Sequence, residues 1–293
     1  WEFRVDAVPF QNKDWRVGVY FNIAHNENKI TEMPDNYIEE NYTFGNGNYA
    51  YRREEGRPMG SFYGYRYKGV YQNKDATYAR DIEGNVMKDI SGNAIVMRNG
   101  SYTVAPGDAI YEDVNHDGVI NQYDIVYLGN SNPRLTGGAG LNVSYKQFKL
   151  SAIFYGRYGQ DVVNATRLNN ESMRGIDNQS TAVLRRWRNE GDQTDIPRAL
   201  YGEGYNTLGS DRFVEDASYL RLKSLSFTYR LPKKAIQRWG FNNIDVYVTG
   251  YNLFTWTKYT GQDPEVKTEN TYAKDTATTP ASIQLVAGFN LSF

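Results

Sequence analysis

The 293-residue sequence contains no cysteine and only two histidines, His25 and His116, which stand far apart. The absence of cysteine excludes disulfide bonds, a thiol nucleophile and a thiolate zinc site. Neither sign of charge dominates, because the sequence has 33 basic and 34 acidic residues. A net charge of −1 argues against a nucleic-acid surface and against an electrostatic membrane anchor.

Long apolar runs are also absent, since no stretch approaches the roughly 18 residues that a membrane-spanning helix requires. Tyrosine, by contrast, is abundant: 25 tyrosines stand beside 13 phenylalanines and 5 tryptophans, at a mean hydropathy of −0.67. Such a composition favours strands with one face in water. It suits a secreted β-sandwich or a transmembrane barrel, and it does not suit a helical bundle.

Apolar and polar residues alternate in segment after segment, which predicts β-strands. At the C-terminus, for example, Leu285, Phe289 and Leu291 share one face. The seven predicted strands cover residues 1–10, 14–28, 134–146, 147–158, 217–231, 242–253 and 281–293. They are longer than the roughly 5–6 residues of soluble strands and match the roughly 9–11 residues of tilted membrane strands. A soluble sandwich produces the same alternation, so period alone leaves both folds open.

The connections between these strands fall into two classes. Some are very short, such as Lys146-Gln147 and a compact helical turn over 231–239. Others are very long, over 29–133, 159–211 and 254–280. Long structureless loops are uncommon in compact soluble domains, whereas outer-membrane barrels alternate short periplasmic turns with long extracellular loops. Residues 60–67 would break this order as a membrane strand, so we expect them in an outer-loop hairpin.

The sequence therefore predicts an all-β fold that is the C-terminal section of a large outer-membrane β-barrel, with about seven antiparallel transmembrane strands and long extracellular loops. Seven is an odd number of strands, which bacterial barrels avoid. We therefore expect the missing wall to come from sequence upstream of Trp1.

Four segments resemble the C-terminal third of the SusC/RagA family of TonB-linked (TonB-dependent) outer-membrane transporters of Bacteroidetes-type bacteria. In order and spacing they match along essentially the whole chain. The segments are 113–121 with 128–134, 194–199, 216–225, and 251–261 with 263–266. One difference is visible, because Trp187 leads into Arg-Asn-Glu-Gly-Asp where the family often has Thr-Pro-Glu-Asn.

The resemblance implies a 22-strand barrel, an N-terminal plug that is not in this chain, energy from TonB, and a SusD-like surface lipoprotein that acts as a lid. It implies active import of oligomeric nutrients, either glycan or peptide fragments, across the outer membrane. The alternative is a self-contained, secreted calcium-binding β-domain that recognises carbohydrate.

Residues 113–124 fit the twelve-residue pattern of a calcium-binding loop, with Gly118 at its sixth position. Aspartate replaces the usual glutamate at the last position. A turn held by side-chain bonds of Asp and Asn accounts for the same residues. The ion would have a structural role, and no organic cofactor is expected. The predicted calcium ligands are Asp113, Asn115, Asp117, Val119 through its carbonyl, Asn121 and Asp124.

Catalysis is not expected, because the loop carboxylates lack a paired histidine or nucleophile motif. The acids considered are Asp108, Glu112, Asp161, Asp192 and Asp195. The loop tyrosines could stack on sugars or peptides, or could hold the loops together; they include Tyr63, Tyr65, Tyr67, Tyr71 and Tyr205.

The C-terminal segment 288–293 resembles the signal by which outer-membrane barrels are recognised for insertion. Its expected positions are Gly288, Leu291 and Phe293.

Overall fold

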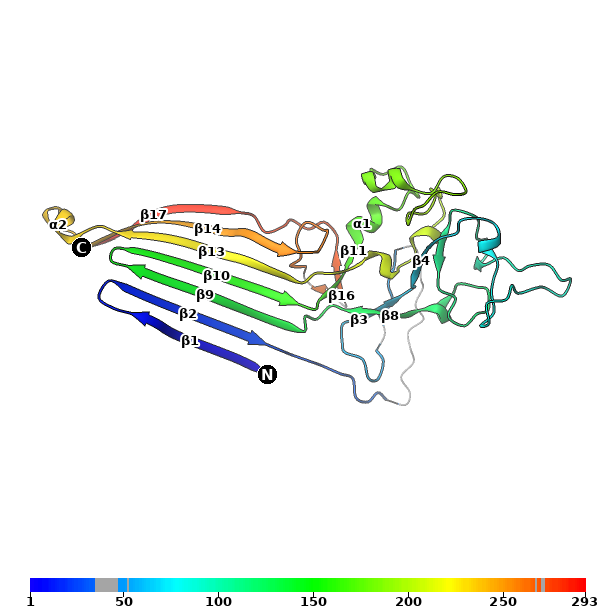
Figure 1. Cartoon of the computed structure of the whole chain (residues 1–293), viewed down its shortest axis with the longest axis horizontal. Coiled ribbons are helices and arrows are strands. Elements are labelled where there is room, and N and C mark those ends of the chain that lie inside the picture. Colours follow the sequence, from blue (N-terminus) through cyan, green and yellow to red (C-terminus); the bar gives the residue numbers. More distant parts are fainter. Residues whose placement is uncertain (35–46, 52, 267, 270–271) are drawn as a thin grey trace.

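The computed structural model describes residues 1–34, 47–51, 53–266, 268–269 and 272–293. Its main element is a seven-stranded antiparallel sheet, in which the strands lie side by side in chain order (Figure 1). All seven predicted strands are confirmed, with shifted ends. They are β1 (Glu2–Gln11), β2 (Trp15–Ala24), β9 (Leu135–Tyr145), β10 (Phe148–Tyr158), β13 (Tyr219–Arg230), β14 (Asn243–Thr257) and β17 (Gln284–Ser292).

One face of this sheet, called the apolar face below, collects the apolar residues of the alternating pattern. Cross-strand register fixes it: Phe21 lies opposite Ala139, which lies opposite Phe154. In the described strands the alternate positions on this face carry no charged side chain. Many of its side chains have no cover, and Phe227 and Phe289 are 47% and 67% exposed. An apolar surface of this extent marks a binding or membrane-facing surface.

The opposite, polar face carries charged residues, serine, threonine and tyrosine. Two tyrosines cover glycines on neighbouring strands here. A Cβ on Gly140 would overlap the ring of Tyr20, and one on Gly288 would lie 2.6 Å from the Tyr247 hydroxyl. These glycines therefore give the large rings of the polar face room to lie flat.

The short connections gather at one end of the sheet and the long ones at the other (Figure 1). At the short end, Asn12 Oδ1 accepts the N–H groups of Asp14 and Trp15 at 2.9 and 2.8 Å, which closes the β1–β2 turn. The predicted helical turn is confirmed as α2 (Lys233–Ile236) and η6 (Gln237–Trp239). An aromatic pair, Trp15 with Tyr145, lies near this end with ring centroids 4.3 Å apart.

The three long connections, 25–134, 159–218 and 258–283, form what we call the loop region. It contains short strands, namely β3 (Ser61–Gly64), β4 (Tyr67–Val70), β5 (Arg98–Asn99), β6 (Tyr102–Thr103), β7 (Ala109–Tyr111), β8 (Val126–Asn130), β11 (Asp161–Asn164), β12 (Val214–Asp216), β15 (Thr268–Glu269) and β16 (Tyr272–Asp275). Its helical turns are α1 (Ala165–Asn170), η1 (Asp75–Thr77), η2 (Gln122–Asp124), η3 (Thr181–Arg185), η4 (Tyr205–Thr207) and η5 (Asp211–Phe213). The loop region is thus a folded body with its own small sheets.

Residues 60–67 lie outside the seven-stranded sheet, as expected, but the predicted hairpin is wrong. Strand β3 pairs with β8, and β4 pairs with β7, so neither pairs with the other. The partner strands are distant in sequence, so no local turn motif predicts these pairings.

The packed cores of the chain lie almost entirely in the loop region. Tyr65, Tyr71 and Tyr205 are 2–4% exposed and belong to one cluster with Tyr111 and Ile120. Tyr63 is fully buried as well. The loop tyrosines named from the sequence therefore hold the loops together, and Tyr67 packs at the edge of the same cluster.

None of the helices in the described residues is both long enough and apolar enough to cross a membrane.

Candidate functional site: the loop region and the polar face

Strands from the second and third long connections meet in one small sheet, β12-β11-β16-β15, at the loop end of the seven-stranded sheet. Strand β11 pairs antiparallel with β12 and parallel with β16. Its residue Val163 lies opposite Lys274, and Asp161 lies opposite Asp216. Because these partners come from the second and third connections, this sheet fixes two separate loops against each other.

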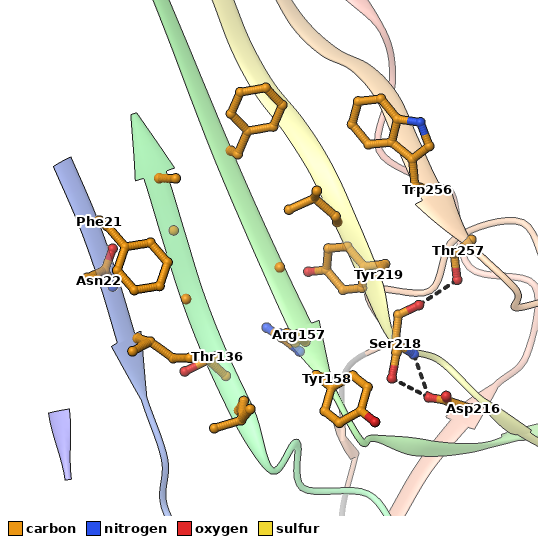
Figure 2. A pocket seen from close by; sticks show the side chains of 18 of the residues that line it. Phe21, Asn22, Thr136, Arg157, Tyr158, Asp216, Ser218, Tyr219, Trp256 and Thr257 are labelled. Atoms are coloured by element: carbon orange, nitrogen blue, oxygen red, sulfur yellow. Dashed lines mark hydrogen bonds between the residues drawn. The ribbon is translucent and has the colours of Figure 1, made fainter. Parts of the chain in front are cut away.

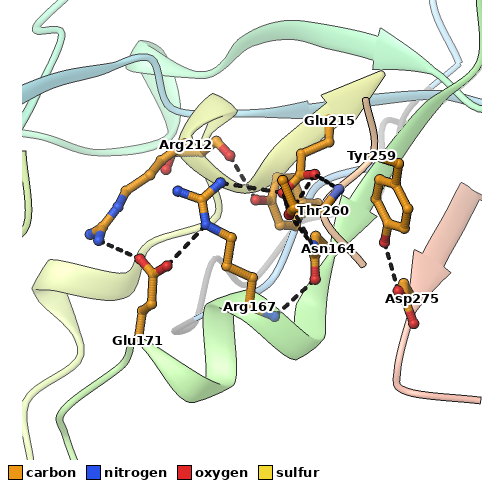
Figure 3. A network of polar contacts seen from close by, with 10 residues as sticks. Asn164, Arg167, Glu171, Arg212, Glu215, Tyr259, Thr260 and Asp275 are labelled. Carbon is orange, nitrogen blue, oxygen red and sulfur yellow. Dashed lines mark hydrogen bonds and ion pairs between the residues drawn. The ribbon is translucent and has the colours of Figure 1, made fainter. Parts of the chain in front are cut away.

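A network of buried charges joins the same elements (Figure 3). Glu171, just after α1, accepts bonds from Arg167 Nε at 3.0 Å and Arg212 Nη2 at 2.8 Å. The side chains of Glu171 and Arg212 are each only 6% exposed. Arg167 reaches on to Glu215 at 3.3 Å, and Thr260 donates its hydroxyl to Glu215 at 2.8 Å. Loss of one partner would leave an uncompensated charge in a buried place.

A second network surrounds Asp108, which is completely buried. Its Oδ1 accepts a bond from Arg198 Nε at 2.7 Å, and its Oδ2 accepts the hydroxyl of Tyr102 at 2.7 Å. Ala105 N–H and the amide of Asn206 also donate to it. A carboxylate with so many donors is a structural acceptor that binds two distant loop segments together.

The other acids weighed for catalysis lie apart from one another. Glu112 pairs with Arg66 and Lys68. Asp161 accepts the Asn130 N–H at 3.0 Å, and burial raises the pKa of its carboxyl.

Two more of those acids lie in turns. Asp192 accepts the N–H groups of Arg188 and Asn189 within a turn. Asp195 offers its carbonyl to the Tyr67 hydroxyl.

The structure gathers the predicted calcium loop into a set of tight turns. Asp113 accepts the N–H groups of Asp117 and Gly118, Asp117 accepts that of Val119, and Asn115 donates its amide to Asp117. The six predicted ligands therefore lie in one local loop. The described residues contain no group of three or more His, Asp or Glu drawn together around one point.

The last predicted ligands belong to the capping box of η2. Asn121 Oδ1 accepts the Tyr123 N–H, while Asp124 accepts the N–H groups of Asn121 and Val114 at 2.8 Å each. Burial raises the pKa of Asp124, with the nearby Asp113 and Asp117 adding to the rise. The turn interpretation explains every one of these bonds, and calcium binding stays a prediction.

Of the residues of the proposed insertion signal, Gly288 and Leu291 lie on β17 at the edge of the sheet, and Phe293 directly follows this strand. Leu291, opposite Ile244, stands on the apolar face, and the Phe293 ring contacts Phe241 with centroids 4.9 Å apart. Gly288 lies under Tyr247 on the polar face. Their role in insertion stays a prediction.

A buried arginine on the polar face of β13 holds the third long connection. Arg221, whose side chain is 3% exposed, binds Asp263 and, at 2.9 Å, Glu265. Lys223 also binds Glu265 at 2.9 Å. The segment after β14 is thus fastened across the polar face of the sheet.

A polar cavity of about 670 Å³ opens beside α1. Amide groups and cations dominate its lining, which includes Asn169, Asn170, Asn178, Arg174 and Lys274. A smaller cavity of about 390 Å³ lies where β2 and β9 meet the loop region, beside His25, Tyr127 and Arg134. Both cavities are lined by hydrogen-bonding groups.

Comparison with known proteins assigns the chain to a family. No protein-family model matches the sequence. The TonB-dependent receptor P3 of Formosa agariphila is 32% identical over 277 residues, which are 92% of this chain and 25% of that receptor. The TonB-dependent receptor SusC of Bacteroides thetaiotaomicron is 27% identical over 301 residues, covering all of this chain and 26% of SusC.

Among solved structures, that of the RagAB peptide transporter superposes with a TM-score of 0.73 and 26% identity, over all of this chain and 29% of that one. The chain belongs to the SusC/RagA family of TonB-dependent receptors. It corresponds to the C-terminal portion of the family's barrel and spans about a quarter of the length of the curated relatives that it matches. The seven-stranded sheet is therefore a section of a larger SusC/RagA barrel wall.

Sequence reasoning did not find the ion networks of this SusC/RagA chain. Arg212 and Glu171 stand 41 positions apart, and Arg198 and Asp108 stand 90 apart. Single charged residues in loops normally lie in solvent, so their sequence context gave no signal of burial.

We predict that the isosteric change Glu171→Gln loosens the loop region, because it leaves Arg212 and Arg167 without their shared carboxylate. Breaking a buried pair in this way costs about 3–5 kcal/mol. Hydrogen exchange of the full-length protein should become at least tenfold faster in 164–171 and 211–216. The control is Arg230→Gln, which removes an exposed pair with Asp245 at the other end of the sheet. Equal exchange in the Glu171→Gln protein and the unaltered protein would contradict the role of the network.

Proposed function

We propose that the full-length protein is an outer-membrane importer of oligomeric nutrients, powered by TonB and working with a SusD-like lid lipoprotein. The observation that carries this proposal is the apolar face. Seven neighbouring strands form this face, and the described residues that alternate onto it include no charged side chain. Such an apolar face suits contact with the hydrocarbon core of a bilayer. The polar face suits the water-filled interior of a wide barrel.

The same proposal gives the chain an orientation. All 293 residues form the C-terminal part of one barrel domain, with 29–133, 159–211 and 254–280 as extracellular loops. Short turns face the periplasm in outer-membrane barrels, and here they gather at the end opposite the loop region. A 22-strand barrel is wide enough to need a plug, which we place upstream of this segment together with the contact to TonB.

A polar oligomer, glycan or peptide, suits the loop region as ligand. The cavity beside α1 offers amides from Asn169 and Asn170 and the exposed cation of Lys274, groups that bind sugar hydroxyls and peptide bonds alike. The relatives are named receptors and a peptide transporter. The four buried carboxylates of the described residues, Asp108, Asp124, Glu171 and Asp275, all accept hydrogen bonds within the fold. We therefore propose no catalytic activity.

The alternative, a secreted carbohydrate-binding β-domain, leaves the apolar face without a cover. Side chains such as Phe289 and Leu285 are 67% and 75% exposed and would stand in water together with their neighbours. Soluble domains rarely expose an apolar patch of this size.

The decisive experiment is deletion of the gene for the full-length protein, followed by growth on defined carbon or nitrogen sources. We expect growth to be lost on one oligomeric nutrient and kept on its monomer, because only the oligomer needs active import. The full-length protein should also co-purify with a surface lipoprotein encoded beside it. Normal growth on every oligomer, with a barrel that purifies alone, would overturn the proposal.

We also propose that residues 113–124 bind one structural calcium ion. Each oxygen of Asp113 accepts one N–H and keeps a second lone pair, and the spacing of the loop supports hard-oxygen ligation. Terbium luminescence of the full-length protein, excited through Tyr123, should saturate and be displaced by calcium. Asp117→Asn should weaken this binding at least tenfold, with Asp81→Asn, in a separate exposed turn, as control. The absence of a terbium signal, or equal signals from the Asp117→Asn and unaltered proteins, would contradict calcium binding and favour the turn interpretation.

A further inference from the structure

A hollow of about 740 Å³ opens near the loop end of the seven-stranded sheet (Figure 2). Three of its large lining residues belong to the apolar face, since Phe21, Phe154 and Trp256 come from β2, β10 and β14 at positions that share that face. The flanking side chains are open to the surroundings: Trp256 is 52% exposed and Tyr158 61%. The hollow is therefore a recess in the outer surface of the wall.

Two glycines on neighbouring strands make the floor of this recess. Gly137 lies opposite Gly156, with Ile23 on one side of the pair and Leu220 on the other. This row of the face thus has two neighbouring positions with no side chain. Ala139, in the next row on β9, extends the gap.

The neighbouring strands approach so closely that only glycine fits at these two positions. A Cβ on Gly137 would lie 2.7 Å from the Asn22 carbonyl oxygen, and one on Gly156 would lie 2.8 Å from that of Tyr219. Side chains at these two positions would push the strands apart. The recess is therefore built into the backbone of the wall and does not depend on a rotamer.

Polar groups border the recess on the side of the loop region. Ser218, Thr257 and Lys258 line it there, beside Asp216, whose carboxylate accepts both the N–H and the hydroxyl of Ser218. Ion pairs near this border join Arg157, Arg221 and Lys223 to Asp263 and Glu265, and Lys258 itself is exposed. Its exposed ammonium places a cation at this border.

Arg157 also borders the recess, but its guanidinium is directed elsewhere. It lies opposite Tyr219 on the polar face and approaches Glu265 at 3.9 Å. Of the two described cations that line the recess, Lys258 is therefore the exposed one, at its loop end.

We propose that this recess holds an acyl chain of a lipid A molecule of the outer leaflet, with a headgroup phosphate at Lys258. This inference rests on the outer-membrane placement proposed above. Walls of Phe, Leu and Trp with a backbone floor suit a hydrocarbon chain, and aromatic residues such as Tyr158 and Trp256 suit the level of the headgroups. The recess lies at the loop end, which the proposal places outside, and lipid A is the phosphorylated amphiphile of that leaflet.

A narrow chain fits this recess better than a second copy of the protein does. The glycine floor lies below the side chains of Ile23 and Leu220, so the flat face of another sheet would rest on those side chains and leave the floor empty. A single acyl chain, by contrast, can enter between them.

Native mass spectrometry of the full-length protein, extracted from its outer membrane in mild detergent, tests this. The unaltered protein should retain one lipid A molecule. Ala139→Leu, which fills the recess, should reduce the retained fraction at least tenfold. Lys258→Gln should reduce it severalfold, and the difference between Lys258→Gln and the unaltered protein should shrink at high salt, because the phosphate contact is electrostatic.

Matched controls separate filling from general disturbance. Ala287→Leu enlarges a small residue of the same face on β17, away from the recess, and Lys146→Gln removes a cation at the opposite end of the sheet. Both proteins should retain lipid A like the unaltered one. In addition, bromine-labelled lipid A should quench Trp256 fluorescence, measured with the other tryptophans replaced by phenylalanine, and Ala139→Leu should abolish the quenching.

Several results would overturn the inference: equal retention of lipid A by the Ala139→Leu and unaltered proteins, retention of a phospholipid in its place, or a dimer that dissociates on Ala139→Leu. Insertion and nutrient-dependent growth are measured on the same strains. A protein that inserts and supports growth yet binds no lipid A refutes only this inference, whereas a protein absent from the outer membrane refutes the proposed function.

Discussion

The backbone hydrogen-bond ladder of seven neighbouring strands is the constraint on which the rest of this structure depends. A strand turns successive side chains to opposite faces, so one ladder separates an uncharged apolar face from a polar one. A register slip of one residue would move Phe21 and Phe154 to the polar face and charged residues such as Arg221 to the apolar face. The register is kept by two-residue and three-residue turns at one end, and tyrosine rings lying on Gly140 and Gly288 reinforce it.

The ladder also explains why the loop region needs a core of its own. The sheet offers its polar face and its rim to the long connections, and neither supplies apolar surface to pack against. The loops therefore bury tyrosines such as Tyr65 and Tyr205 among themselves. The buried pair Arg212–Glu171 and the half-buried pair Arg198–Asp108 then tie segments that are distant in sequence. Such pairs add little net stability but fix one arrangement, because each leaves a costly unpaired charge if the loops shift.

The period of two made the seven strands predictable, since residues such as Leu285 and Phe289 repeat on one face without interruption. The turn at 231–239 was predictable because its proline and following helix formers act locally. The pairing of β3 with β8, and the partner of Arg212, were not, because they depend on contacts between residues far apart in the chain. The calcium ligands stay a prediction, because the bonds that Asp124 accepts from Asn121 and Val114 serve a helix cap that the spacing alone does not distinguish from ligation. The recess over Gly137 and Gly156 required the register of two strands, which no single segment contains.

The central claim is that this wall crosses the outer membrane with its loop region outside. Because this segment has no cysteine, single cysteines can report it in a full-length protein otherwise free of cysteine. Ile90 lies fully exposed in the loop region, and Lys234 lies exposed in the turn at the opposite end of the sheet. In intact cells a membrane-impermeant maleimide should label Ile90→Cys at once and Lys234→Cys only after the outer membrane is permeabilised. Labelling of Lys234→Cys in intact cells, with Ile90→Cys protected, would contradict the account.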